Sequence, residues 1–189
     1  MLVNFGQPLG GVVQFAYTVP DLDQAISDYA TRLKIGPWFV RGPFQPDKAF
    51  YRGEPTSPRI TLARAFSGHA MIELVFQHDE IPSVFRERIA ASGYGFHHWA
   101  LFTTNIDADV ARYATHGYPV AFSDTTPTGT RIVYVDATRD LPGMIELIEL
   151  TPRQERLYTD MYTAAIGWDG SDPVRRHPLD GGGEGEGGG

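Results

Sequence analysis

The 189-residue sequence contains no cysteine, which excludes disulfide bonds, cysteine nucleophiles and thiolate metal sites. Any bound metal must therefore be held by histidine, carboxylate or amide side chains. The absence also fits a reducing compartment, and we expect a cytoplasmic protein. No stretch approaches the roughly 18–20 apolar residues of a membrane span. The N-terminal "MLVNFGQPLG" lacks the charged and apolar regions of a signal peptide.

Basic clusters are also missing. The 16 Lys and Arg residues are outnumbered by 23 Asp and Glu residues, and the net charge of −7 is spread along the chain. This pattern argues against a nucleic-acid partner, so a small molecule is the expected ligand. With 42% hydrophobic residues, the chain can bury the core of a globular domain.

The C-terminal end is rich in glycine and has almost no apolar residues. Residues 179–189, which end in "DGGGEGEGGG", are predicted to be a disordered tail because they have nothing to bury. Residues 153–178 are predicted to form a helical extension, with a helix of about three turns that packs on the domain or on a second subunit. Leu157 and Met161 lie at helical spacing on it.

The rest of the chain follows one plan twice. "VVQFAYTVPDLDQAISDYATRLKIG" and "HHWALFTTNIDADVARYATHGYPV" each predict a strand, a turn and a helix, which we expect to end at Gly36 and Gly117. The first helix has a capping box at Asp21 and Gln24 and an apolar stripe that ends at Leu33. "MIEL" occurs 73 residues apart, at the end of each copy. A duplicated β-α-β-β-β module explains this placement.

These observations predict one structural domain over residues 10–152. The first module and a linking helix, "DEIPSVFRERIAASG", are expected within residues 1–92, and the second module within residues 93–152. The apolar positions of the linking helix begin at Ile81.

Strand parity selects polar residues that face the interior. Aligning "QFAYT" with "HWALF" pairs Gln14 with His98 and sends the neighbouring His97 to the opposite face, so His97→Ala should leave metal binding intact. Glu73 and Glu146 each stand alone on an apolar row. A buried carboxylate is costly unless it is paired or coordinates a cation. The competing interpretations are a hydrogen-bonded core histidine and solvent-facing glutamates.

The order of elements resembles the vicinal oxygen chelate superfamily, which contains glyoxalases, bleomycin-resistance proteins and extradiol dioxygenases. The resemblance covers residues 10–152 and depends on "VPDLDQAISDYATRLKIGPW", "GFHHWAL" and "PGMIELIEL". It is greatest for the glyoxalase-like and methylmalonyl-CoA-epimerase-like branch. It implies an α+β fold in which two βαβββ modules curl a mixed sheet into half-barrels around a central site.

The same resemblance implies a divalent metal held by Gln14, Glu73, His98 and Glu146. This ligand set is similar to that of Zn-dependent glyoxalases, so zinc is expected first, with Mn, Co or Ni as alternatives. The implied reaction is an isomerisation, epimerisation or elimination, in which a proton moves next to an oxygen that the metal holds. Glu146 is the first candidate for the catalytic base and Glu73 the second.

A metal-free binding protein and an extradiol dioxygenase are the two other functions to compare with a metal-dependent isomerase or lyase. A metal-free protein that sequesters a small molecule remains the alternative, because the Gln14 amide is a weaker ligand than imidazole. An extradiol dioxygenase needs two histidines and one carboxylate on iron, whereas His98 is the single histidine at the ligand positions, which argues against that activity.

The substrate is expected to be an apolar small molecule of the aromatic or polycyclic kind. Large aromatic side chains are the candidates for its binding site: Trp38, Phe39, Phe44, Phe50, Tyr51, Phe66, Trp99, Phe102 and Tyr134. The arginines are scattered along the sequence and predict no coenzyme A or glutathione site. We expect a homodimer, and the sequence leaves open whether the half-barrels pair within one chain or between partners.

Overall fold

The computed structural model describes residues 1–177. The predicted tail, residues 179–189, lies outside the described residues. The four helices of the described part are α1 (Leu22–Leu33), α2 (Val84–Ser92), α3 (Ile106–Thr115) and α4 (Pro152–Ala165). The strands are β1 (Val12–Thr18), β2 (Trp38–Phe44), β3 (Ala49–Tyr51), β4 (Glu54–Thr56), β5 (Ile60–Ser67), β6 (Ala70–Gln77), β7 (Gly95–Thr103), β8 (Val120–Thr125), β9 (Arg131–Val135), β10 (Met144–Glu149) and β11 (Val174–Arg176).

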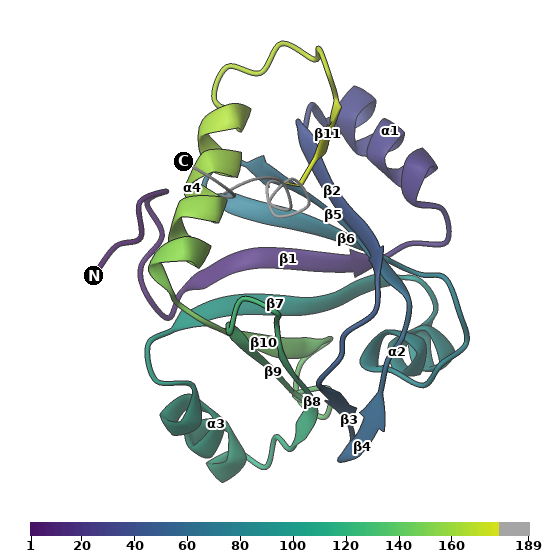
Figure 1. The fold of residues 1–189 in the computed structure, drawn as a ribbon, viewed down its shortest axis with the longest axis vertical. Helices are drawn as coiled ribbons and strands as arrows, with labels where there is room; N and C mark the ends of the chain where they lie inside the picture. The colour runs from purple at the N-terminus through teal and green to yellow at the C-terminus, as the bar shows by residue number, and fades with distance from the viewer. Residues whose placement is uncertain (178–189) are drawn as a thin grey trace, which may run out of the picture.

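One curled mixed sheet contains all of these strands, in the order β11-β2-β5-β6-β1-β7-β10-β9-β8-β3-β4. The first module contributes β2-β5-β6-β1 and the second contributes β7-β10-β9-β8, so the two halves mirror each other in strand order. β1 and β7 run side by side through the middle of the molecule (Figure 1) and pair antiparallel. The predicted α+β fold with two βαβββ modules is confirmed, and the modules meet within one chain.

Two pieces of the sheet were not expected from the sequence. The β3–β4 hairpin leaves the first module and pairs with β8 of the second. β11 follows α4 and adds a parallel strand beside β2, at the opposite edge. Both additions are short strands without clear alternation, which explains why their pattern did not predict them.

The helix ends differ slightly from the prediction. α1 begins at its Asp21 cap, whose side chain accepts a hydrogen bond from the Gln24 backbone nitrogen at 2.9 Å. It ends at Lys34 in the left-handed conformation, so the prediction of an end at Gly36 is wrong by two residues. Leu33, beside this cap, is 59% exposed, and Ile81 lies before α2 and is 37% exposed. The sequence predicts both residues on the apolar stripes of these two helices, so both predictions are wrong at these ends.

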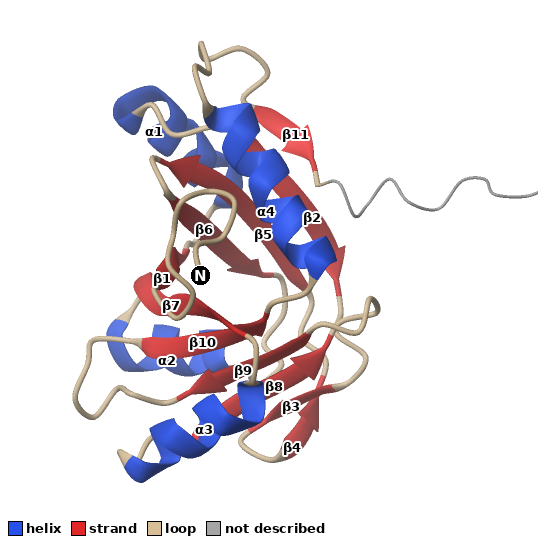
Figure 2. Cartoon of the chain, turned by 90° about the vertical axis from the view of Figure 1, so that its left-hand side faces the viewer, coloured by secondary structure: helices blue, strands red, loops and turns tan. Residues whose placement is uncertain are grey.

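The two faces of the sheet are covered by different helices. α1 packs with Trp38 and Leu74 on the outer face of the first module, and α3 covers the outer face of the second. α4 lies across the inner face instead, where it buries Leu157 and Met161 against residues of both modules (Figure 2). The C-terminal helix therefore belongs to the wall of the central space.

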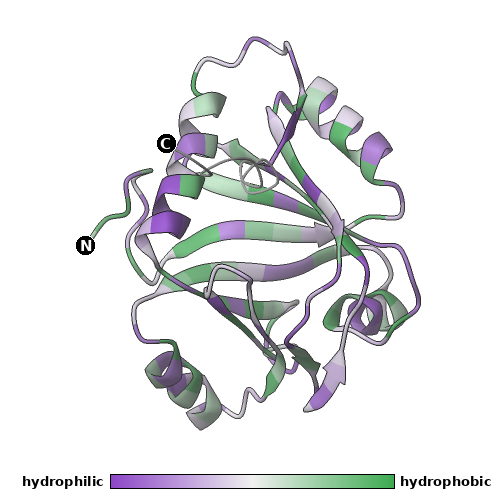
Figure 3. Cartoon of the chain, viewed as in Figure 1, coloured by the Kyte–Doolittle hydropathy of each residue, from purple (hydrophilic) through white to green (hydrophobic). Residues whose placement is uncertain are grey.

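The central strands are largely apolar, but hydrophilic segments interrupt β1 and β7 (Figure 3). Among residues 1–177, no helix has both the length and the apolar character needed to cross a membrane.

Candidate functional site

The four predicted ligand residues lie on four neighbouring strands at the centre of the sheet. Gln14 is on β1, Glu73 on β6, His98 on β7 and Glu146 on β10, and none is more than 3% exposed. The structure brings all four side chains together.

Their polar atoms form one cluster. Gln14 Nε2 lies 3.2 Å from Glu73 Oε2, 3.3 Å from His98 Nε2 and 3.3 Å from Glu146 Oε2. His98 Nε2 lies 3.1 Å from Glu146 Oε2 and 3.6 Å from Glu73 Oε2. Ligand atoms about 2.0–2.3 Å from one metal ion are roughly 2.8–3.8 Å apart in tetrahedral or octahedral geometry. The observed separations fall in this range, and the nitrogen and oxygen donors suit a divalent transition metal.

The amide of Gln14 is turned away from metal binding in this structure. Its nitrogen faces the cluster, and its oxygen accepts a hydrogen bond from the Tyr158 hydroxyl at 3.0 Å. Within residues 1–177, no group of three or more His, Cys, Asp or Glu side chains is arranged to hold a metal ion as it stands. The amide nitrogen links the two carboxylates, so a metal would require rotation of the Gln14 amide to present its oxygen. The Tyr158 hydroxyl could then accept from the amide nitrogen.

A chain of hydrogen bonds fixes the tautomer of His98. His97 Nε2 lies 3.1 Å from the Val84 carbonyl oxygen, and His97 Nδ1 lies 2.8 Å from His98 Nδ1. A carbonyl can only accept, so His97 Nε2 carries a hydrogen. Burial first, and then the charge of His98, lowers the pKa of His97 well below its ordinary value. A neutral His97 therefore accepts at Nδ1, and His98 Nδ1 donates.

This arrangement leaves His98 Nε2 facing the two carboxylates. A lone pair at that position would face Glu73 and Glu146, and a bound metal ion would remove the repulsion between these groups. The site therefore fits a bound cation on the evidence of its own hydrogen bonds.

The assignment of His97 to the opposite face is wrong, and a β-bulge is the reason. Ala16 pairs with His98 while Tyr17 pairs with Phe96, which leaves His97 as an extra residue in β7. A bulge breaks the alternation of side chains. The ring of His97 consequently packs beside Phe85, with ring centroids 4.9 Å apart.

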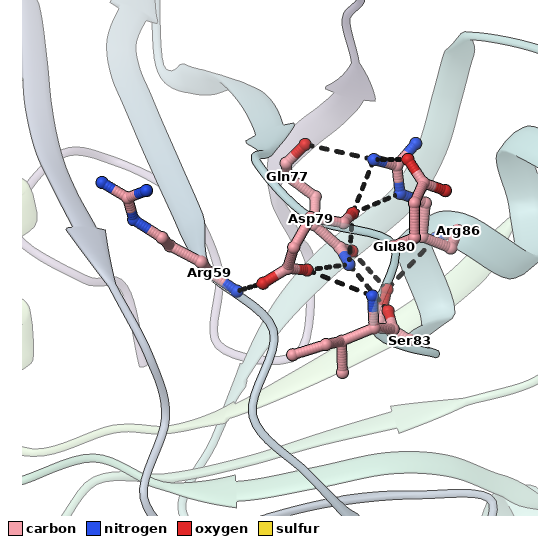
Figure 4. Close-up of polar contacts among 7 residues, drawn as sticks. Arg59, Gln77, Asp79, Glu80, Ser83 and Arg86 are labelled. Carbon is pink, nitrogen blue, oxygen red and sulfur yellow. Dashed lines mark hydrogen bonds and ion pairs between the residues drawn. The ribbon is translucent and has the colours of Figure 1, made fainter.

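A polar network lies at the start of α2, the helix whose first residue is Val84 (Figure 4). The Ser83 hydroxyl caps the helix by accepting from the Arg86 nitrogen at 3.1 Å and donates to Gln77 Oε1 at 2.6 Å. The Arg86 guanidinium donates to the Asp79 carbonyl oxygen at 2.6 Å and 2.8 Å. The network joins α2 to the end of β6, the strand that carries Glu73.

We expect His97→Ala to weaken metal binding about 10- to 100-fold, which is the usual effect of removing a group that orients a ligating histidine. His97→Gln should restore much of the loss, because its amide can accept from His98 and donate to Val84. Isothermal titration calorimetry with zinc measures both variants. Equal metal affinity of His97→Ala and the wild type would show that His97 only fills space.

The two glutamates differ in their surroundings. Glu73 Oε1 accepts from Arg64 Nε at 2.7 Å, and Arg64 is almost completely buried. Burial alone would raise the pKa of Glu146, but attraction by His98 and Arg64 and a hydrogen bond from Tyr134 outweigh it, so the pKa is lowered. Burial first, and then the charge of Glu146, raises the pKa of Tyr134 well above its ordinary value. Tyr134 therefore remains a hydrogen-bond donor.

A cavity of about 290 Å³ opens onto this cluster. Glu73 and Glu146 lie at its inner end, and its walls are largely apolar, with Leu62, Phe85 and Phe122 among them. The shape and lining are those of a small-molecule pocket.

Most of the aromatic residues predicted to bind substrate do not line this pocket. Phe44 and Tyr134 do. Among the others, Trp38 and Trp99 pack on the outer face under α1 and α3, and Phe39, Phe66 and Phe102 belong to the core beneath α4. Phe50 is 46% exposed on the β3–β4 hairpin, and the Tyr51 hydroxyl donates to Glu87 at 2.8 Å. These seven residues do not line the pocket, because their positions along the strands direct them to the outer face or to the core under α4, or because they lie on the hairpin.

Two site residues were missed in the sequence. Arg64 stands between Leu62 and Phe66 on an apolar row and pairs directly with Glu73 across β5 and β6. The pattern that supports Glu73 in the sequence, a lone charge on an apolar row, is also present at Arg64. Tyr158 carried no such signal, because its partner Gln14 lies 144 residues earlier in the chain.

The comparisons with known proteins agree with this architecture. The model of the Glyoxalase/Bleomycin resistance protein/Dioxygenase superfamily matches residues 13–134. The fold is similar to methylmalonyl-CoA epimerase from Mycobacterium tuberculosis, with a TM-score of 0.54, 21% identity and coverage of 78% of this chain and 93% of that one. It is also similar to a methylmalonyl-CoA epimerase in complex with methylmalonyl-CoA and NH4+, with a TM-score of 0.52, 19% identity and coverage of 77% and 97%.

A hypothetical protein from Bacillus halodurans C-125 gives a TM-score of 0.54, with 17% identity and coverage of 75% of this chain and 94% of that one. No curated protein sequence matches the chain at a significant level.

Proposed function

The chain belongs to the Glyoxalase/Bleomycin resistance protein/Dioxygenase superfamily, and we propose that it is a divalent-metal-dependent isomerase, epimerase or lyase for a small, largely apolar molecule. One observation carries the proposal. A histidine nitrogen lies between two buried carboxylates, one from each module, at the inner end of an apolar cavity. The epimerase neighbours are consistent with proton-transfer chemistry on this fold.

The residues that would hold the metal are Gln14, Glu73, His98 and Glu146. When bound, the cation would stabilise the negative charge that develops on a carbonyl or hydroxyl oxygen of the substrate and so acidify the adjacent C–H group. Glu146 would take that proton and return it to the substrate. The apolar wall of the cavity would exclude water from the reacting carbon.

Glu146 is better suited to this role than Glu73. Arg64 donates to Glu73 Oε1 at 2.7 Å, so a charged hydrogen bond already occupies this oxygen and fixes the carboxylate in place. Tyr134 instead holds Glu146 by a neutral hydrogen bond, which orients the carboxylate without an ion pair to its oxygens. The order proposed from the sequence, Glu146 first, is therefore retained.

A metal-free binding protein is the second candidate function. The observation that favours it is the Gln14 amide nitrogen, which donates to both carboxylates in this structure. Arg64, which pairs with Glu73, also balances part of the negative charge without a metal.

We expect the purified protein to contain about one divalent metal ion per chain, zinc first and Mn, Co or Ni as alternatives. Metal binds only the folded state, so free metal at a hundred times its Kd should stabilise the protein by about 2.7 kcal/mol. For a domain of this size, this corresponds to a Tm increase of about 5–11 °C. Elemental analysis and differential scanning calorimetry before and after treatment with chelator measure both quantities.

Negligible metal after growth in supplemented medium, with no change in Tm when these four ions are added, would favour the metal-free binding protein.

A further inference from the structure

A second, smaller cavity adjoins the pocket described above. It has a volume of about 180 Å³ and shares Arg41, Arg64, Ile132 and Glu146 with the larger cavity. The rest of its wall comes from the β8–β9 turn around Thr128, from Ile148 on β10 and from the N-terminal half of α4. The two cavities therefore meet beside the glutamate that we propose as the base.

The smaller cavity is rich in positive charge. Arg41, Arg64 and Arg153 line it, and Glu146 is its one carboxylate among the described residues. The chain as a whole carries a net charge of −7, so this concentration of arginine is local. The pKa of His177 is affected by the positive charge of the same arginines. Burial first, and then the charges of Arg64 and Arg41, lower its pKa to about 3.

The strand register explains how two of these arginines come together. β2 pairs antiparallel with β5 so that Phe39 lies opposite Arg64 and Arg41 lies opposite Leu62. Arg41 and Arg64 are therefore diagonal neighbours on the inner face of the sheet. In the sequence they are 23 residues apart, and this spacing alone predicts no cluster of arginines.

Arg64 has donors that Glu73 does not use. A guanidinium carries five N–H groups, and the structure shows one hydrogen bond for the Arg64 side chain, from Nε to Glu73 Oε1. An arginine guanidinium stays protonated in proteins, so Arg64 is a cation. Its remaining N–H groups lie at the wall of both cavities.

The third arginine and the helix terminus come from outside the region that the family model matches, which ends at residue 134. α4 begins after its Thr151 cap, and Arg153 and Gln154 in its first turn line the cavity. The backbone N–H groups of a first helical turn favour a nearby negative charge. Here they add to three guanidinium groups.

We propose that this cavity binds an oxyanion of the substrate, a carboxylate or a phosphate, while the apolar body of the same molecule occupies the larger pocket. The substrate would accordingly be a small apolar acid or phosphate ester. The inference rests on the proposed function for the reacting position only, since anion binding needs neither metal nor turnover.

The test compares three naphthalene derivatives on protein freed of metal by chelator: 2-naphthoate, 2-naphthyl phosphate and the neutral 2-naphthamide. Without metal, a preference for an anion can come only from the protein's own arginines and the N-terminus of α4. We expect at least one of the two acids to bind about tenfold more tightly than the amide in calorimetric titration, because a hydrogen bond between charged groups adds that much affinity. The tighter acid identifies the anion, and the preference should fall as salt is raised.

Arg153→Ala and Arg41→Gln should each reduce the ratio of acid to amide affinity about three- to tenfold. Arg112→Ala is the matched control, because Arg112 pairs with Asp109 on the surface of α3 and should leave the ratio unchanged. Equal binding of the acids and the amide to the wild-type protein, or an unchanged ratio in both pocket variants, would overturn the inference. Neither result depends on whether the protein proves to be a metal enzyme.

Discussion

Glu146→Gln is expected to slow proton transfer by about 10²- to 10⁴-fold, the contribution that a general base usually makes. The substitution keeps the size of the side chain and a coordinating oxygen but removes the charge and the basicity. Metal affinity should fall only moderately. The measurement is exchange of an acidic C–H for deuterium, followed by NMR, in a panel of apolar ketones and aromatic hydroxyketones, half of which carry a carboxylate.

Two other glutamates provide the comparison. Glu149→Gln alters the same strand at a residue whose carboxylate accepts from the Arg131 backbone nitrogen, so exchange should proceed at the wild-type rate. Glu73→Gln should weaken metal binding and leave Arg64 without its partner, yet a metal-loaded sample should still exchange. If instead Glu73→Gln stops the exchange and Glu146→Gln does not, the base lies in the first module and the assigned roles are reversed.

The sequence indicates the architecture of the site because each polar residue interrupts an apolar strand, and because this pattern occurs once in each module. Gln14, Glu73, His98 and Glu146 each interrupt an apolar strand, and the repeated "MIEL" places the two glutamates at equivalent positions. Alternation along a strand then decides which side of the sheet each residue faces. The structure brings these four side chains together in the arrangement that this alternation implies.

The parts that the sequence did not predict depend on long-range pairing. The bulge in β7 arises from its register with β1, and nothing in "FHHWA" indicates an extra residue there. Tyr158 reaches Gln14 only because α4 packs on the inner face. The clustering of Arg41, Arg64 and Arg153 requires both the β2–β5 register and the position of α4. The aromatic residues failed as pocket candidates for the same reason, since size and apolarity do not specify a face.

His98 is oriented by hydrogen bonds that lead back to the start of α2. The polar network before α2 joins this helix to β6 (Figure 4). The Val84 carbonyl on α2 fixes the hydrogen on His97, and His97 fixes the tautomer of His98. These hydrogen bonds lie within the first module, between α2 and β7, and within β7. A change in the linking loop could therefore alter metal affinity without any contact to the ligands.

His98→Ala is expected to have the largest effect on metal binding, a loss of affinity of at least about 100-fold, because a ligand matters more than the groups that orient it. It removes the one imidazole of the set, and the two carboxylates then face each other with only the Gln14 amide between them. The increase in Tm on adding zinc should disappear with it. Zinc titration and calorimetry measure both effects without any substrate. His116→Ala, on the exposed end of α3, is the control and should bind zinc as the wild type does. Should His98→Ala retain wild-type zinc affinity, the metal lies elsewhere, and the proposed role of the whole buried cluster fails with it.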